Sequence, residues 1–316
     1  MTIPEFNFSN AIFHIFRTGG PKGFLWKFAL AYGVCGMLMY ALMGWAFAPI
    51  FASMFNPDVA NDPDAMDALV LENMGRIFGG YAIIMVAALL LWIMFEAASQ
   101  RRYMRGDGFG LRFSADEGRL LVLGLIFFGI FLATYIGLFV VMALVIGTSV
   151  AVSGDSGAGA GLAGVLMFVL IIAYFVGLLF IMVRLSPAAA LTIRDRKIRF
   201  SSAWRVSKGK GWAIFGSWML QYLIMYGVMI VVYLIVIALA FATVMPSLMG
   251  SGGAEDPAEV LAALSTPGAL VTALVAGFLL SAVGALFLHA FDGPAALAAK
   301  TDPEWVNQDA IGDTFG

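Results

Sequence analysis

The chain has 316 residues, of which 61% are hydrophobic and only 12% are charged, and its formal net charge is −2. Soluble globular domains carry roughly 25% charged residues, whereas the mean hydropathy here is +0.93. The composition therefore excludes a soluble globular protein and predicts a membrane protein. Cys35 is the only cysteine, which excludes an intramolecular disulfide.

The N-terminal segment carries four apolar side chains at helical spacing: Phe8, Ile12, Ile15 and Phe16. His14 falls on another face of the same helix, and Ser9 stands where an N-cap would stand. This pattern predicts a short amphipathic helix that lies in the inner membrane interface and ends at the Gly-Gly-Pro sequence of residues 19–21.

Six later stretches supply the roughly 20 consecutive apolar residues that a helix needs to cross a bilayer: 24–50, 77–99, 119–149, 161–185, 212–247 and 267–291. They predict an all-α, polytopic membrane protein with six transmembrane helices and a single transmembrane domain over residues 1–300. Ser114 and Glu117 form a capping box that would start the third helix. A short helix is expected near residues 258–264, and residues 301–316 form a polar tail that we expect to be loosely docked.

Charge is distributed unequally between the connectors. Nearly all the basic residues lie in three of them: Arg17, Lys22 and Lys27; Arg101, Arg102, Arg105, Arg112 and Arg119; and the segment 184–210. Arg76 is the one basic residue predicted on the outer side. The intervening loops are acidic: Asp58, Asp62, Asp64, Asp67 and Glu72; Asp155; and Glu255, Asp256 and Glu259. Because Lys and Arg near helix ends are retained on the cytoplasmic side, both termini are predicted to be cytoplasmic.

Short sequence similarities suggest an internal repeat. Three outward-going helices follow Phe8-Ser9-Asn10-Ala11, Phe113-Ser114-Ala115-Asp116 and Phe200-Ser201-Ser202-Ala203, and the inward-going helices end in Phe95-Glu96-Ala97-Ala98, Ser186-Pro187-Ala188-Ala189 and Gly293-Pro294-Ala295-Ala296. We predict three parallel hairpin repeats, at about 8–100, 113–191 and 200–299, each with an interfacial amphipathic segment before its hairpin. The alternative is the general similarity of Leu-, Gly- and Ala-rich helices.

Four ionisable residues lie near the inner ends of the inward-going helices: Glu96, Arg184, His289 and Asp292. Charged groups at membrane depth are costly and are the first candidates for a functional site. We expect the four to converge as a buried charge cluster in which Arg184 pairs with Glu96 or Asp292. Such a cluster could lock the hairpins together, face water and headgroups, or form part of an ion or proton pathway.

Five basic residues are candidate contacts for anionic lipid: Arg196, Lys197, Arg199, Lys208 and Lys210. Each such charge near an anionic leaflet contributes about 1 kcal/mol, and the nearby Trp204 and Trp212 favour the interface. Membrane topology alone also accounts for these charges. Nucleic acid is not an expected partner.

The fifth apolar stretch carries a polar stripe of Gln221, Tyr222, Tyr226 and Tyr233. These side chains would either form hydrogen bonds between helices or line a cavity for a lipid or solute. Two distant histidines and one cysteine form no metal-binding motif, and neither a phosphate-binding loop nor a dinucleotide fingerprint is present. The sequence therefore predicts no metal, no cofactor and no catalytic residue.

The segment that follows the fourth apolar stretch resembles a group of bacterial six-helix membrane proteins. The matching residues are Arg184, Pro187, Ala188, Phe200, Ala203, Trp204, Lys208 and Gly209. These proteins are similar to the membrane domain of some glycerophosphodiester phosphodiesterases, which place the hydrolase in a separate soluble domain. The resemblance implies a multi-pass architecture in the bacterial inner membrane and no activity.

Three functions remain open at this stage. A non-catalytic inner-membrane protein that acts as a scaffold, an assembly partner or a lipid-interacting module is favoured, with membrane lipids, a second copy of the chain or other membrane proteins as partners. A transporter or channel would need a polar path, but Gln221 is the only strongly polar side chain well inside a span. A membrane-embedded lipid enzyme would have only Glu96, His289 and Asp292 for its chemistry.

Overall fold

The computed structural model describes residues 4–153, 157–250 and 257–305, and within these ranges it contains helices and no strand. The helices are α1 (Phe8–Ile12), the 3₁₀ helix η1 (Phe13–Phe16), α2 (Phe24–Ser53), α3 (Pro57–Ala60), α4 (Pro63–Glu72), α5 (Met74–Arg105), α6 (Ala115–Ser153), α7 (Gly157–Leu185), α8 (Ala188–Asp195), α9 (Phe200–Val206), α10 (Gly211–Gly250), α11 (Pro257–Leu264) and α12 (Pro267–Lys300). Six of them are long and apolar enough to cross a membrane: α2, α5, α6, α7, α10 and α12. The prediction of an all-α protein with six transmembrane helices is confirmed.

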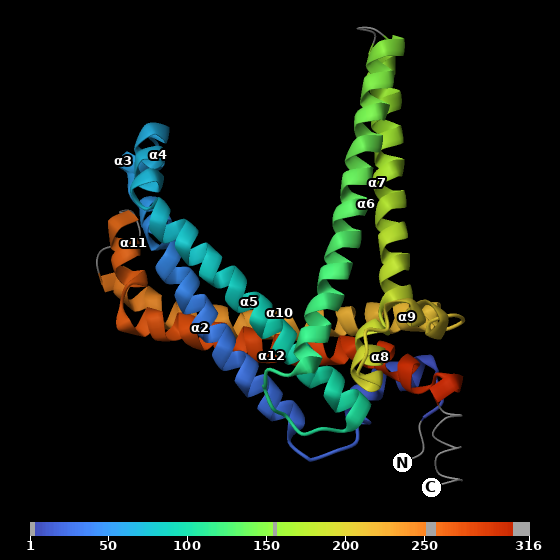
Figure 1. The fold of residues 1–316 in the computed structure, drawn as a ribbon. Helices are drawn as coiled ribbons and strands as arrows, with labels where there is room; N and C mark the ends of the chain where they lie inside the picture. Colours follow the sequence, from blue (N-terminus) through green and yellow to red (C-terminus); the bar gives the residue numbers. More distant parts are fainter. Residues whose placement is uncertain (1–3, 154–156, 251–256, 306–316) are drawn as a thin grey trace.

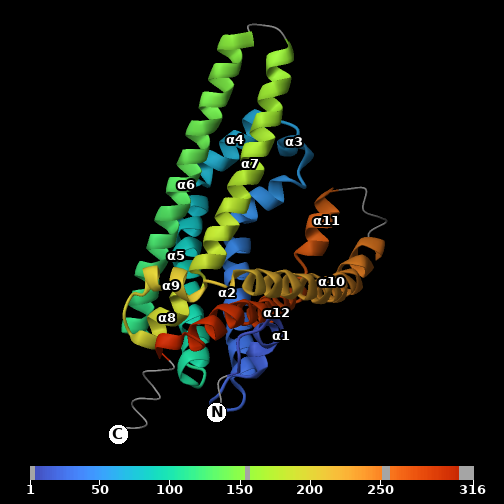
Figure 2. The ribbon, with the colours of Figure 1, turned by 90° about the vertical axis from the view of Figure 1, so that its right-hand side faces the viewer.

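The six long helices form three antiparallel hairpins that diverge from a common base (Figures 1 and 2). Helices α2, α5 and α12 pack against one another and α10 packs against α12, whereas α6 and α7 pack along each other and meet the rest of the molecule near the base. The described N-terminal and C-terminal ends both lie at the base, on the opposite side from α3 and α4.

Small residues close the base. Ala97 on α5, Ala188 and Ala190 on α8, and Ala296 and Ala298 on α12 are buried in one core. Small side chains let helix backbones approach closely, which is the usual basis of helix packing in membranes. The three alanine-containing exits that align in the sequence therefore meet in space, although the threefold repeat itself stays a prediction.

Local sequence explains several helix ends. The backbone N–H of Ser114 donates to Glu117 Oε2 at 2.8 Å, which confirms the capping box at the start of α6. Gly106, at φ 67°, ends α5 in the left-handed conformation. The predicted short outer helix is present as α11. Helix α12 continues through Pro294 to Lys300, beyond the apolar stretch that ends near residue 291.

The N-terminal segment differs from its prediction. Asn7, not Ser9, caps α1 by accepting the backbone N–H of Asn10 at 2.8 Å. The chain then tightens into η1, and the change in helical period turns His14 inward to 1% exposure while Phe16 stays 72% exposed. The prediction that four apolar side chains share one face of a uniform helix is therefore wrong. The segment packs against α10 and α12 instead of presenting these four side chains to lipid.

The start of the polar tail is firmly docked, contrary to expectation. Asp302 is 2% exposed and forms ion pairs with Arg194 at 3.5 Å and Arg205 at 3.3 Å. The Arg194 guanidinium lies 5.3 Å from the centre of the Trp305 ring. Residues 306–316 of the predicted tail lie outside the described ranges, as do Asp155, Glu255 and Asp256 of the predicted outer loops.

Candidate functional site

Polar side chains gather where α5 and α12 meet near the base. Glu96, Ser99 and Gln100 share one face of α5, because residues three and four apart in a helix are neighbours. His289 and Asp292 share a face of α12 for the same reason. Glu96, Ser99, Gln100 and His289 are buried, and Asp292 is partly buried. We call these five residues the polar cluster.

Ser99 is the centre of the polar cluster. Its hydroxyl group donates to Asp292 Oδ2 at 2.5 Å and lies 2.7 Å from His289 Nδ1. Gln100 Nε2 donates to Glu96 Oε1 at 2.9 Å. Beside the cluster, the Tyr103 hydroxyl donates to the backbone carbonyl of His289 at 2.8 Å, and the two rings stack with their centres 4.4 Å apart. The cluster therefore fastens α5 to α12.

The polar cluster has more hydrogen-bond acceptors than donors. In the part of the chain that the structure describes, no basic side chain lies within ion-pair distance of Glu96 or Asp292. Gln100 Oε1 and His289 Nε2 are buried and have no hydrogen-bond partner there. Glu96 and Asp292 therefore lie together without a described counter-ion.

Arg184 does not join this cluster. Its guanidinium stacks on the Trp204 ring at 4.8 Å and forms no ion pair within the described residues. Phe180, one turn earlier on α7, contacts the same Trp204 ring, so this face of α7 points toward α9. The predicted pairing of Arg184 with Glu96 or Asp292 is therefore wrong, whereas Glu96, His289 and Asp292 do come together around Ser99 and Gln100.

The arginines at the end of α5 hold α6 in place. Arg101 pairs with Glu117 at 2.5 Å, and both side chains are nearly completely buried. Arg105 pairs with Asp116 at 2.7 Å, and Arg119 contacts the same carboxylate at 2.8 Å. These basic residues therefore fix the start of the α6–α7 hairpin.

The five candidate lipid contacts divide into two groups. Lys210 donates to the backbone carbonyls of Ala298 and Thr301 at 3.0 and 3.2 Å, so it caps the end of α12. Burial lowers the pKa of Lys210 from its ordinary value, although the nearby Asp302 opposes this shift. Arg199 pairs with Asp195 at 3.0 Å. The other three are exposed and form no ion pair with a described residue: Arg196, Lys197 and Lys208.

A cavity of about 500 Å³ lies beside the polar cluster, between the α6–α7 hairpin and helices α5 and α10. Its lining is formed by Trp92, Glu96, Leu120, Leu123, Gly124, Phe127, Phe128, Ile130, Phe131, Leu178, Ile181, Met182, Ser186, Ala189 and Trp218. Among these lining residues, Glu96 and Ser186 are the two that carry a polar group on an aliphatic side chain. Phe128 and Met182 are 60% and 52% exposed, so the cavity opens to the surroundings of the helices. We call it the Glu96 cavity.

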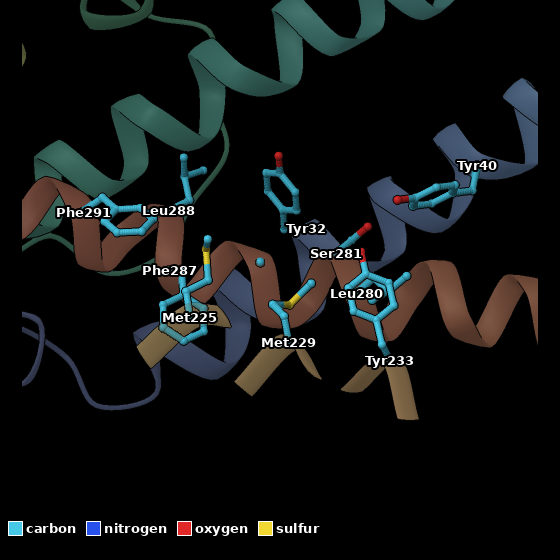
Figure 3. Close-up of a pocket in the computed structure, with 11 residues that line it drawn as sticks. Tyr32, Tyr40, Met225, Met229, Tyr233, Leu280, Ser281, Phe287, Leu288 and Phe291 are labelled. Carbon is cyan, nitrogen blue, oxygen red and sulfur yellow. The ribbon is translucent and has the colours of Figure 1, made fainter. Parts of the chain in front are cut away.

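A second hollow of about 330 Å³ lies between α2, α10 and α12 (Figure 3). Tyr32 and Tyr40 of α2, Tyr233 of α10 and Ser281 of α12 line it together with apolar side chains. Tyr233 thus fulfils the predicted cavity-lining role of the polar stripe. Gln221 fulfils the other role, because its Nε2 donates to the backbone carbonyls of Ile12 and Ala290 at 3.3 and 3.1 Å.

Ser99 and Gln100 were not predicted from the sequence, because the prediction of the charge cluster considered ionisable residues and these two side chains are uncharged. Their spacing of three and four residues from Glu96 was the available signal. The Glu96 cavity was also missed, because a space between hairpins depends on their relative placement. Comparison with protein-family models, with curated proteins and with solved structures finds no match to this chain.

Proposed function

We propose that this chain is a non-catalytic, lipid-interacting protein of the bacterial inner membrane, with both termini in the cytoplasm. The Glu96 cavity is the observation that carries the proposal. A volume of about 500 Å³ falls within the ~300–1,000 Å³ of typical small-molecule sites, which are mostly apolar with a few placed polar groups. Because the cavity lies between membrane-crossing helices, the apolar chain of a lipid is the ligand that its surroundings supply.

The architecture supports a binding role for the polar cluster instead of a catalytic one. Ser99 is fully buried, and its hydroxyl proton is directed to Asp292. A serine nucleophile needs a base that takes this proton and a substrate that reaches the oxygen. In the geometry of the cluster, Ser99 instead joins α5 to α12, and Glu96 is the member that reaches the cavity wall.

The proposed orientation rests on charge. Exposed Arg196, Lys197 and Lys208 lie at the base, whereas the acidic α3–α4 segment lies at the opposite end of the molecule. Retention of basic residues in the cytoplasm favours a cytoplasmic base. Single cysteines at Asp62 and Arg196, in a Cys35→Ala background, should react with an impermeant maleimide from opposite sides of the membrane. Labelling of both from one side would contradict the orientation.

Lipid binding in the Glu96 cavity is tested by filling the cavity. Leu178 lines it, whereas Val176 lies two residues away on α7, is 62% exposed and is not part of the lining. We expect Leu178→Trp to lose co-purifying lipid in native mass spectrometry of protein extracted in polymer nanodiscs. Val176→Trp, the matched control, should retain the wild-type amount. Equal lipid retention by the two variants would remove the proposal.

A further inference from the structure

The polar groups around the Glu96 cavity indicate what kind of lipid it takes. Trp218 Nε1 already donates to the backbone carbonyl of Phe291 at 2.9 Å, and the Ser186 hydroxyl donates to the carbonyl of Val183 at 2.9 Å. Trp92 turns the six-membered end of its ring toward Gly124. The hydrogen-bonding groups of the wall that remain are therefore the carboxyl group of Glu96, the lone pairs of Ser186 and the indole N–H of Trp92.

The interior behind Glu96 further indicates the kind of lipid. Gln100, which is 2% exposed, donates to Glu96 through Nε2 and leaves its own Oε1 buried without a partner among the described residues. The carboxyl group of Asp292 lies in the same cluster, and no described cation pairs with either acid. Two carboxyl groups that lie together without a described cation are most stable uncharged, so the site offers a phosphate or carboxylate head no counter-charge. Such an anion is costly to bury there.

The position of Glu96 deep in the protein favours an uncharged hydrogen-bond donor over an ammonium group as the head of the lipid. Glu96 lies five residues before Arg101 on α5, which is about 7.5 Å further along the helix axis. Arg101 is already inside the molecule, where it pairs with Glu117. An ammonium group at this position would also meet uncharged carboxyl groups and would give up its water for one wall of oxygens, whereas a hydroxyl group needs only one acceptor to be satisfied.

We propose that the Glu96 cavity binds the chain of an uncharged lipid whose hydroxyl group donates a hydrogen bond to the carboxyl group of Glu96. This inference rests on the proposed lipid-binding function and adds the class of the ligand. Monoacylglycerols and long-chain alcohols have the required chemistry, because one apolar chain ends in hydroxyl groups and carries no charge.

The test uses three probes with one oleoyl or oleyl chain each: monooleoylglycerol, oleoyl lysophosphatidic acid and oleylamine. The full-length protein in nanodiscs is incubated with each probe, and occupancy is counted by native mass spectrometry. We expect the wild type to retain monooleoylglycerol about tenfold better than either charged probe, which corresponds to one well-made hydrogen bond to a charged or polar acceptor. Retention of lysophosphatidic acid or oleylamine at an equal or higher level overturns the proposal.

Variants of Glu96 test whether its carboxyl group determines the binding of monooleoylglycerol. Glu96→Leu should lower monooleoylglycerol occupancy about tenfold, whereas Glu96→Gln keeps one acceptor oxygen and the side-chain shape and should lose less. Glu72→Leu, at an exposed carboxylate on α4, is the matched control and should bind like the wild type. If Glu96→Leu fails to fold, as judged by its circular dichroism melt, Glu96→Gln and Ser186→Ala supply the result. Unchanged binding by the folded Glu96 variants overturns the proposal.

The two proposals fail in different ways. If Leu178→Trp removes binding but the three probes compete equally, the cavity binds lipid chains and the hydroxyl specificity is wrong. If Leu178→Trp retains monooleoylglycerol like Val176→Trp, the cavity is not the binding site and the proposed function fails with it.

Discussion

Ser99 connects the buried His289 ring to the partly buried carboxyl group of Asp292. Its hydroxyl oxygen lies 2.7 Å from His289 Nδ1 and 2.5 Å from Asp292 Oδ2. A hydroxyl group can serve both because it donates one hydrogen and accepts through its lone pairs. The junction of α5 and α12 therefore depends on one small side chain.

We predict that Ser99→Ala lowers the free energy of unfolding by about 1–3 kcal/mol, because it leaves the buried Nδ1 of His289 without its partner and removes a hydrogen bond of Asp292. Thermal unfolding in detergent, followed by circular dichroism, measures the change. Thr134→Ala is the control, since the Thr134 hydroxyl bonds only to the Phe131 carbonyl of its own helix at an exposed position. A loss no larger than that of Thr134→Ala would show that the Ser99 bridge contributes little.

His14 predicts a pH dependence of stability. Burial, assisted by the charges of Lys300 and Arg17, lowers the pKa of His14 from 6.5 to about 3. The unfolded chain therefore binds this proton at a higher pH than the folded protein does. The stability that neutral His14 provides is full above about pH 6.5 and is lost as the pH falls toward 3.

His14→Phe should reduce this dependence, because the ring can still stack on Tyr103, whose centre lies 5.2 Å away, and cannot take a proton. The measurement is the unfolding midpoint between neutral pH and about pH 5, in the wild type and the variant. We expect a smaller fall for His14→Phe. An identical fall in both proteins would mean that His14 does not control acid stability.

For single residues, the sequence predicts which side chains are unusual in an apolar helix, but it does not predict the direction in which they point. Glu96, His289 and Asp292 are identifiable because ionisable residues are rare in apolar helices. Arg184 satisfies the same criterion and yet stacks on Trp204, because the rotation of α7 about its axis is set by packing with α9. Spacing within one helix is local information, whereas that rotation is not.

Among the elements, α5 and α6 are joined by a buried ion pair. Arg101 and Glu117 are 2% and 3% exposed and lie 2.5 Å apart. Removing one partner from such a pair leaves a buried charge uncompensated, and this typically costs about 3–5 kcal/mol. Replacing both with apolar residues of similar size can be nearly neutral.

We therefore predict that Arg101→Met alone destabilises the protein by about 3–5 kcal/mol and that Arg101→Met with Glu117→Leu recovers most of the loss. Unfolding midpoints of the two single variants and the double variant complete the cycle. Arg112→Met is the control, because its pair with Asp107 is 55% and 36% exposed and should contribute no more than about 1 kcal/mol. Additive losses in the double variant would contradict a coupled pair.

The helices themselves were largely predictable, since their causes are local. The capping box of Ser114 and Glu117 starts α6, and long apolar stretches give the six spans. The N-terminal segment was not predictable, because its change from α1 to η1 depends on packing against α10 and α12. The extension of α12 through Pro294 had no local signal either, since its alanines become favourable only when buried against α5 and α8.

The whole molecule consists of a packed group, formed by α2, α5, α10 and α12, and a separate α6–α7 hairpin (Figure 1). Sequence could give the number of spans and the charge difference between the ends. It could not give this divergence, because the direction of each hairpin depends on contacts at the base between residues distant in sequence.

The divergence should respond to membrane thickness. In a thicker bilayer each hairpin must stand closer to the membrane normal to span it, so the outer ends should approach one another. Spin labels at Phe168 on α7 and Phe78 on α5, both well exposed, in a Cys35→Ala background measure this by electron–electron resonance. We expect a shorter distance in longer-chain phospholipid. The pair Leu30 and Phe78, within the single α2–α5 hairpin and both exposed, should not change.

A constant distance between Phe168 and Phe78 in both lipids would show that the base holds the hairpins rigidly. In that case the next test would be substitutions that remove the Arg101–Glu117 and Arg105–Asp116 ion pairs at the base. A change in the control pair as well would point to loosening of the whole molecule.

The unequal lengths of the helices affect the membrane around the protein. Helix α2 has 30 residues and α10 has 40, which correspond to axes of about 45 and 60 Å. A hydrocarbon core of about 30 Å is shorter than both axes, and the two helices cannot match it at one tilt, so at the tilt that fits α2 the lipids beside α10 are stretched. A particle with one such thickened edge is expected to turn that edge toward thicker patches of membrane and to collect along their border.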